Sequence, residues 1–340
     1  MKTYSKKEDH RLQPSTAIGD ERSESVPPQQ TGTPPFQISA DQGSADSNTS
    51  AQRSINPSLS AGQTLQRTPN VEYRSLPEQL GPRQRGSLAV RGTGDADAFS
   101  INDINQGSIG DCYFLAALGG IAHTNPNLLR QAITENSNGT YSVRLYRKVE
   151  TGFLFFTSTS FVPVEVSVYP NFPGSVNAVD AANPNASANP AHAHGGDNNF
   201  EGNPELWVRI VEKAYALFRG SYKIIGSGGL GASALETLTG QAHTERVLDD
   251  GHRARIIEAV RNGIATEAGT TQSKINNASA ADRQFAAQNS IVGGHAYTVI
   301  AADATGITVR NPWGTAARNA TPRLTWAQFD ALFNQYSSRN

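Results

Sequence analysis

The sequence contains a single cysteine, Cys112, among its 340 residues. One cysteine cannot form an intramolecular disulfide, and it excludes zinc sites built from four cysteines. Cys112 is therefore either a small buried residue or a reactive thiol, and a buried cysteine taken at random is more often inert. Which of the two applies depends on the residues around it.

The chain also lacks an excess of charge of one sign and any long apolar run. Its formal net charge is −1, so no basic excess indicates nucleic acid or an anionic membrane surface as a partner. No apolar run approaches the ~20 residues of a membrane helix, and the N-terminus lacks the apolar stretch of a secretory signal peptide. We expect a protein without membrane insertion, cytoplasmic or exported by a route that uses no cleavable hydrophobic signal peptide.

Hydrophobic residues make up 37% of the chain, below the level usual for a globular protein. Much of the deficit falls in residues 1–90, which are rich in Ser, Pro, Gln, Thr and Asn. Such a segment cannot bury enough apolar surface to offset the entropy lost on ordering, so we predict a disordered low-complexity leader over 1–90. The remainder is long enough for one large domain or two lobes.

Apolar periodicity in that remainder predicts both helices and strands. Helices are expected at 112–122, 205–219, 253–261 and 324–335, and strands at 140–149, 153–169, 295–302 and 306–310. The last two strands form a predicted hairpin.

Two polar stretches are interpreted as loops with insertions, residues 170–204 and residues 264–290. The first is expected to lie away from the motifs described below. Its His192 and His194 have no nearby set of partner ligands, so we expect solvated side chains and not a metal site.

Residues 226–231, GSGGLG, fit the G-x-G-x-x-G pattern of dinucleotide-binding folds. That pattern requires a preceding strand and a helix opening directly on it within a βαβ unit. A long predicted helix and the short stretch YKII precede it here, and no βαβ repeat exists elsewhere. We interpret the glycines as a flexible link between two lobes and expect no nucleotide cofactor.

The position of Cys112 favours a reactive thiol. It begins a predicted apolar helix, where free backbone N–H groups and the helix dipole favour a thiolate. Gly107 and Gly110 precede it and allow a backbone to approach closely. A catalytic cysteine also needs a base within reach and donors for the oxyanion.

A histidine held by a third polar group would supply that base. His295 begins one strand of the predicted hairpin, and Asn311 follows the other. In such a hairpin the Asn311 side-chain oxygen can accept from one ring nitrogen of His295 and leave the other for the thiol. Trp313 is placed to cover that bond, and Gln106 can donate a side-chain N–H to an oxyanion.

Five stretches together resemble the calpain family of papain-like cysteine proteases. In chain order they read DINQGSIGDCYFLAAL, LWVRIVEKAYALFRGSY, ALETLTG, GGHAYTVI and RNPWG. Their order and spacing follow the family across about residues 98–335, essentially the whole region predicted to fold. Five motifs in the right order make the resemblance highly specific.

The resemblance implies an α+β fold of the papain-like two-lobed type, with an α-rich lobe over 91–231, an antiparallel β lobe over 232–340 and the active site between them. It implies a cysteine endopeptidase that acts on protein substrates and needs no cofactor for its chemistry. The implied roles are nucleophile for Cys112, general base and acid for His295, orienting residue for Asn311, and oxyanion hole for Gln106 with the Cys112 backbone N–H. We expect a monomer.

The sequence departs from the family in two places besides the insertion at 170–204, and it keeps one feature of the family's calcium sites. Tyr113 stands where the family usually has Trp, so an aromatic ring is retained. The stretch TAARNATPR after RNPWG has no acidic residue, which predicts loss of the family's second-lobe calcium site. Asp103 and Glu212 match first-lobe calcium positions, so a calcium site there stays open, with a loop cap and a helix or interface charge as the alternative readings.

Two other functions are kept as alternatives. A transglutaminase-like or deamidating enzyme would use the same thiol chemistry on glutamine side chains, but such relatives usually orient the histidine with Asp, and Asn311 favours the protease. A catalytically silent interaction module typically lacks one residue of the triad, and all three are present in this sequence.

Overall fold

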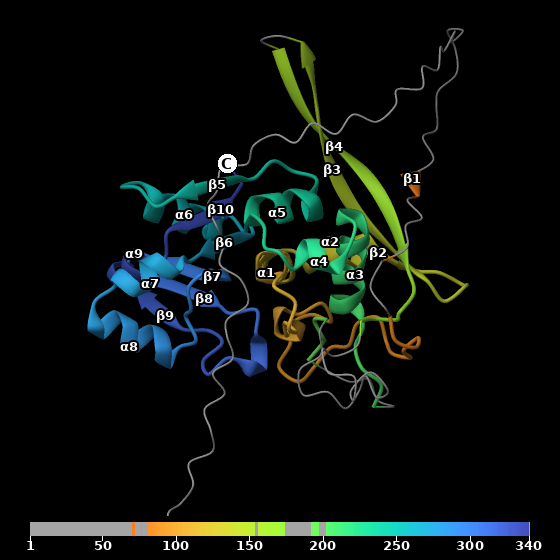
Figure 1. Ribbon diagram of the computed structural model, residues 1–340, viewed down its shortest axis with the longest axis horizontal. Coiled ribbons are helices and arrows are strands. Elements are labelled where there is room, and N and C mark those ends of the chain that lie inside the picture. The colour runs from red at the N-terminus through yellow and green to blue at the C-terminus, as the bar shows by residue number, and fades with distance from the viewer. Residues whose placement is uncertain are drawn as a thin grey trace, which may run out of the picture. The chain divides into compact units, whose positions relative to one another are not determined.

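The computed structural model describes residues 70–71, 76, 80–153, 156–173, 192–196 and 202–339. Its helices are α1 (Cys112–Thr124), α2 (Pro126–Ala132), α3 (Trp207–Arg219), α4 (Tyr222–Ile225), α5 (Gly231–Thr239), α6 (His252–Arg261), α7 (Gln272–Asn277), α8 (Ala280–Gln288) and α9 (Trp326–Leu332). Its strands are β1 (Asn70–Val71), β2 (Ile133–Glu135), β3 (Tyr141–Phe153), β4 (Phe156–Val168), β5 (Thr244–Val247), β6 (Thr266–Gly269), β7 (Ala296–Asp303), β8 (Gly306–Arg310), β9 (Arg323–Thr325) and β10 (Gln335–Ser338). The strands form two sheets (Figure 1).

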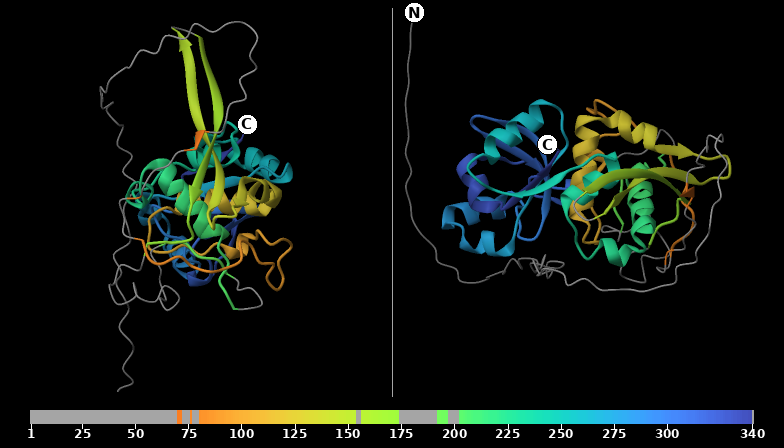
Figure 2. Two further views of the ribbon diagram at one scale, coloured as in Figure 1. Left: turned by 90° about the vertical axis from the view of Figure 1, so that its right-hand side faces the viewer. Right: turned by 90° about the horizontal axis from the view of Figure 1, so that it is seen from above.

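The first sheet has the strand order β1-β4-β3-β2 and is dominated by the long hairpin of β3 and β4. These strands pair in antiparallel register from Tyr141 opposite Val168 to Phe153 opposite Phe156. At the base of the hairpin, Val143 and its neighbours at alternate positions are buried, as the two-residue period of a strand with one covered face requires. The distal half projects beyond the helices that cover the base (Figure 2).

The second sheet has the strand order β5-β10-β6-β7-β8-β9 and is antiparallel throughout. The predicted hairpin is present as β7 and β8. The interpretation of 264–290 as a loop is wrong, because β6, α7 and α8 lie there. The strand β6 is only four residues long and carries a buried Glu267, so its sequence shows no apolar alternation. Its partners β7 and β10 lie elsewhere in the chain, so the pairing that forms the strand is not visible in the local sequence.

Helix α1 lies between the two sheets and is buried over nearly its whole length, from Cys112 to Ala122. An apolar surface on every side is what a fully enclosed helix requires. One side contacts α5, and the other contacts β6 and β7. The Thr298 hydroxyl of β7 donates a 2.6 Å hydrogen bond to the Ala116 carbonyl of α1, so the second sheet is held directly against the helix that Cys112 begins.

Most of the predicted disordered leader lies outside the described residues, but its predicted end at residue 90 is wrong. Leu76, Leu80 and Leu88 pack against the core cluster that contains α1. The Val90 backbone N–H donates to the Glu205 carboxylate. Scattered leucines in a polar stretch carry no helical or strand period, so the sequence pattern gave no sign of this packing.

The lobe boundary predicted after residue 231 remains a prediction. Helix α5 begins at that residue, yet its buried Ala234, Leu235 and Leu238 belong to the same core cluster as α1. A second cluster contains Tyr297, Phe329, Phe333 and other residues of the second sheet with the helices that cover it.

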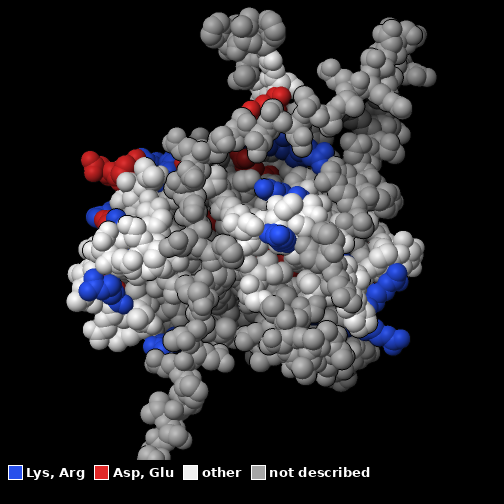
Figure 3. Space-filling view, in the orientation of Figure 1, with Lys and Arg blue, Asp and Glu red and all other residues white. Residues whose placement is uncertain are grey.

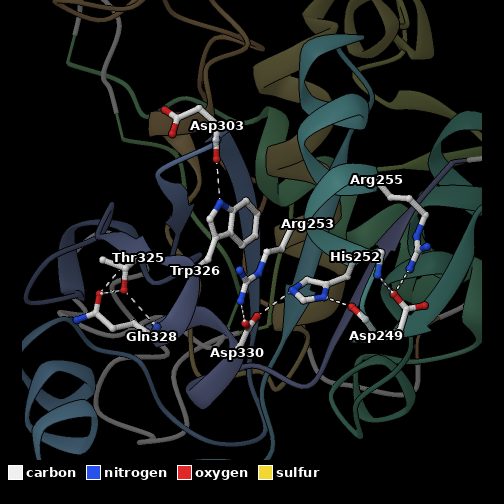
Figure 4. A network of polar contacts seen from close by, with 10 residues as sticks. Asp249, His252, Arg253, Arg255, Asp303, Thr325, Trp326, Gln328 and Asp330 are labelled. Atoms are coloured by element: carbon white, nitrogen blue, oxygen red, sulfur yellow. Dashed lines mark hydrogen bonds and ion pairs between the residues drawn. The ribbon is translucent and has the colours of Figure 1, made fainter.

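Helices α6 and α9 are joined by a polar network on the second sheet (Figure 4). The buried His252 places its Nε2 2.8 Å from Asp330 Oδ1, and Arg253 pairs with the other oxygen of that carboxylate. Trp326 donates from its indole N–H to the Asp303 carbonyl at 2.8 Å, which ties the start of α9 to the end of β7.

The surface of the described residues carries mixed charge. On the face in Figure 3, Lys and Arg side chains and Asp and Glu side chains form small separate groups of both signs. No helix in the described part of the chain combines the length and the apolar character needed to cross a membrane.

Candidate active site

Cys112 is the first residue of α1 and follows the N-cap residue Asp111. The preceding Gly110 allows the tight entry, because a Cβ there would lie 2.6 Å from the Gly226 carbonyl oxygen. The sulfur is close to the backbone N–H of Ala296, the first residue of β7. The thiol therefore lies where the start of α1 meets the start of a strand in the second sheet, and its residue is 8% exposed.

His295 and Asn311 meet at the ends of the hairpin, as the sequence predicted. His295 Nε2 lies 3.0 Å from Asn311 Oδ1. The same oxygen accepts a hydrogen bond from the backbone N–H of Trp313 at 2.9 Å. The centroids of the Trp313 and His295 rings are 4.8 Å apart. Because the Asn311 oxygen is an acceptor, it favours the neutral imidazole tautomer that carries its proton on Nε2. The Nδ1 atom of that tautomer has no hydrogen and presents a lone pair.

Residues that the sequence did not single out hold this pair in place. Asn311 Nδ2 donates to the Ser290 carbonyl at 2.8 Å, which fixes the direction of the amide. The same carbonyl accepts the Tyr297 hydroxyl at 3.1 Å. Thr270 accepts the His295 backbone N–H at 3.1 Å and donates its own N–H to the His295 carbonyl at 2.9 Å. Only the Tyr in HAYTVI gave a sequence signal, since a buried tyrosine hydroxyl requires a partner.

Gln106 lies in the loop before α1 and contacts both halves of the site. Its side-chain Nε2 donates to the Ile109 carbonyl at 2.8 Å and lies 3.5 Å from Asp111 Oδ1. Its backbone N–H donates to the Pro312 carbonyl at 2.8 Å, which ties this loop to the residue after Asn311. An amide nitrogen carries two hydrogens, and those of Nε2 are directed to Ile109 and, over a longer distance, to Asp111, so donation to an oxyanion would have to replace one of these bonds.

Both reactive groups are uncharged at neutral pH in this arrangement. Burial raises the pKa of the Cys112 thiol to about 12; the Ala296 N–H opposes the rise, and the negative charges of Glu267 and Asp111 add to it. Burial lowers the pKa of the His295 imidazole to about 4, although the bond to Asn311 opposes this. A neutral thiol and a neutral imidazole are the protonation states from which a proton can pass from a sulfur to a ring nitrogen.

The glycine-rich stretch 226–231 packs closely around the thiol's neighbours and is not merely a link between lobes. A Cβ at Gly229 would lie 2.5 Å from the Tyr113 ring, and one at Gly231 would lie 2.2 Å from Glu267 Oε2. Tyr113 itself is buried, and its ring packs edge-on against that of Tyr215. The absence of a side chain at Gly229 and at Gly231 is thus required for this close packing against Tyr113 and Glu267.

The stretch 192–196 contradicts the expectation that the insertion lies away from the motifs. His194 exchanges backbone hydrogen bonds with Asn105 at 2.9 and 3.2 Å, and the Ala193 N–H donates to the Glu212 carboxylate at 2.9 Å. His192 is buried and not solvated, with its ring 5.1 Å from that of Phe172. This polar stretch therefore contains a segment whose backbone satisfies two buried acceptors, the Asn105 carbonyl and the Glu212 carboxylate, which its composition did not indicate.

The two residues matched to a first-lobe calcium site have protein partners. Asp103 Oδ2 accepts the Trp207 indole N–H at 2.9 Å and the Ser100 N–H at 2.7 Å. Glu212 accepts the Ala193 N–H and shares a hydrogen bond with Asp111, and burial raises the pKa of both carboxyls, that of Asp111 to about 7. Among the described residues no group of three or more His, Cys, Asp or Glu could hold a metal ion.

Comparison with known proteins gives the chain its family. A sequence model of the calpain family cysteine proteases matches residues 93–153 and 178–333, well over half of the chain. The chain belongs to the calpain family of cysteine proteases. The predicted family and the predicted α+β papain-like class are thereby confirmed.

Individual calpains are similar over nearly two thirds of the chain. Calpain clp-4 of Caenorhabditis elegans is 30% identical over 225 residues, which cover 62% of this chain and 27% of the worm protein. Calpain-9 of Rattus norvegicus is 25% identical over 228 residues, with coverages of 64% and 29%. The calpain-type cysteine protease DEK1 of Arabidopsis thaliana is 29% identical over 237 residues, with coverages of 65% and 9%. The matched part spans less than a third of each of these relatives.

Proposed function

We propose that this calpain-family chain is a cysteine endopeptidase that hydrolyses peptide bonds of protein substrates through Cys112, His295 and Asn311. The observation that carries the proposal is the 3.0 Å contact between His295 Nε2 and Asn311 Oδ1, next to the strand residue whose N–H approaches the Cys112 sulfur. A nucleophile, a base and an orienting group are the three parts that thiol catalysis needs.

The chemical steps follow from the tautomer. His295 Nδ1 takes the thiol proton as Cys112 Sγ attacks the substrate carbonyl carbon, which forms a tetrahedral intermediate. As the C–N bond breaks, the imidazolium returns that proton to the leaving amine, and a thioester remains. Water then attacks the thioester with His295 as base, so that the acid leaves and the thiol is restored.

The negative charge of each tetrahedral intermediate needs donors. The backbone N–H of Cys112, at the start of α1, and Gln106 Nε2 are proposed to supply them. The thiol, the imidazole and the attacking water account for every proton transferred in these steps, so the proposed chemistry requires no cofactor. Calcium dependence is a separate question for the assay.

The proposal includes two broader predictions, one about the oligomeric state and one about the location of the protein. All four proposed groups come from one chain, which supports a monomeric enzyme. A cytoplasmic location is the other, and the assay does not depend on it.

The test is incubation of the purified chain with an unfolded protein, in calcium and in chelator, beside Cys112→Ala. Fragments that appear with the parent chain and not with Cys112→Ala support the proposal. Ammonia release without fragments would overturn it in favour of glutamine deamidation. No modification under either condition by a folded chain would overturn it in favour of a silent interaction module.

A further inference from the structure

A row of polar side chains crosses the second sheet on the face that α1 covers. Ser337 of β10 lies directly opposite both Glu245 of β5 and Glu267 of β6, and Glu267 lies directly opposite Thr298 of β7. Residues directly opposite one another in antiparallel strands point to the same face. Thr298 donates to the Ala116 carbonyl of α1, so Glu245 and Glu267 point toward the first lobe.

The first of the two carboxylates in this row is fully engaged. Glu245 accepts the Ala232 backbone N–H at 3.1 Å, the Gln335 side-chain N–H at 2.6 Å and the Ser337 hydroxyl at 2.6 Å. Three donors, one of them at the start of α5, stabilise a charged carboxylate.

The second carboxylate is not engaged in this way. Glu267 is 4% exposed, and its Oε2 has no hydrogen-bond partner among the described residues. That oxygen lies against the backbone of Gly231, where any side chain would collide with it. A buried carboxyl oxygen without a donor is costly, so a ligand that brings a donor to it would be bound favourably.

The location of Glu267 next to the nucleophile points to that role. Gly269, two residues further along β6, is paired with Ala296, whose N–H approaches the Cys112 sulfur. In its ionised form Glu267 raises the pKa of the Cys112 thiol, which shows that the two groups are electrostatically coupled. Glu267, at 4% exposed, is nearly as accessible as His295, which is 5% exposed and must meet the substrate under the proposed function.

We propose that Glu267 is a specificity-determining residue, whose carboxylate binds a lysine or arginine side chain of the substrate close to the bond that is cleaved. This inference rests on the proposed function. A cationic side chain would donate the hydrogen bond that Oε2 lacks, and its positive charge would reduce the repulsion between the carboxylates of Glu245 and Glu267. Burial and the charge of Glu245 raise the pKa of Glu267 well above its usual value, and a bound cation would favour the ionised form.

The donor set favours an organic cation over a metal ion. The oxygens of Glu245 already accept three hydrogen bonds, which leaves Glu267 as the acceptor with capacity. Calcium takes six to eight oxygen ligands, whereas a guanidinium or an ammonium binds a single carboxylate well.

The first test maps cleavage sites in an unfolded protein and then compares two fluorogenic peptides that differ only by Arg or Leu at the enriched position. Glu267→Gln keeps the volume and removes the charge. The ratio of kcat/KM for the Arg peptide over the Leu peptide is expected to fall about 10- to 100-fold, chiefly through KM. Glu236→Gln is the matched control, since Glu236 lies on α5 and pairs outward with Lys148. An unchanged ratio in Glu267→Gln, or a parent chain without preference for Lys or Arg, would overturn the inference.

The second test separates this inference from the proposed function. Fluorescent Arg and Leu peptides are titrated against Cys112→Ala and against Cys112→Ala with Glu267→Gln. Tighter binding of the Arg peptide that is lost with Glu267→Gln supports the carboxylate site even if the parent chain cleaves nothing. Equal binding of both peptides to Cys112→Ala overturns the site even if cleavage is observed.

Discussion

The Nε2 atom of His295 lies 3.0 Å from the Oδ1 atom of Asn311, across 16 residues of chain. The hairpin of β7 and β8 brings the two residues together, because one precedes its first strand and the other follows its second. Hydrogen bonds from Asn311 to Ser290 and from Trp313 to Asn311 leave the amide only one orientation. This geometry makes the role of Asn311 testable.

Asn311→Ala is expected to lower kcat by about 10- to 100-fold, because the imidazole loses the acceptor that fixes its tautomer and direction. The measurement is steady-state cleavage of a peptide substrate with KM and kcat resolved. Asn319→Ala, at an exposed residue in the loop after Asn311, is the control and should leave both constants unchanged. A loss confined to KM would show that Asn311 acts in binding and not in orienting His295.

Alkylation of the thiol should report its raised pKa directly. Cys112 is the only cysteine, so incorporation of iodoacetamide measures this residue alone. Only the thiolate reacts, and a pKa of about 12 means that its fraction rises about tenfold per pH unit through neutral pH. We therefore expect the alkylation rate of the native chain to climb steadily from pH 6 to pH 9. A rate that is flat over that range would indicate a preformed thiolate–imidazolium pair.

The contact between α1 and β7 leaves no room for a methyl group at Gly119. A Cβ there would lie 2.7 Å from Thr298 Oγ1, although alanine has the higher helix propensity. Gly119→Ala should therefore lower the melting temperature and the activity together, because it displaces the strand that follows His295. Gly119→Ala combined with Thr298→Ala should recover part of both. If the single variant is as stable and active as the parent, the interface is not as close as described.

The network at Asp330 should contribute to stability without contributing to catalysis (Figure 4). Asp330→Ala removes the partner of the buried His252 Nε2 and one partner of Arg253, so we expect a loss of about 1–3 kcal/mol in the free energy of unfolding. Urea denaturation measures this loss. Cleavage under native conditions should stay within about twofold of the parent; a larger loss of activity would mean that α9 supports the site directly.

Local pattern in the sequence predicted the elements that carry the site. Apolar periodicity marks α1 and α3, and alternation marks β7 and β8, because those elements bury one face or every face. It did not predict β6, whose four residues include a buried glutamate, nor the packed segment 192–196, whose contacts are made by backbone groups. Burial of polar groups depends on partners that are distant in the chain, and a local pattern does not contain them.

By its residue types and their order, the sequence alone determined the family, the α+β class and the candidate thiol, imidazole and amide. Tertiary structure decided how these groups are held and charged. The direction of the Asn311 amide depends on Ser290, and the pKa values of Cys112 and His295 depend on burial between α1 and the second sheet. The role proposed for Glu267 rests on the tertiary structure too, because strand pairing brings it near Cys112 and leaves its Oε2 without a donor among the described residues. Electrostatic interactions depend on distance in space and not on separation along the chain.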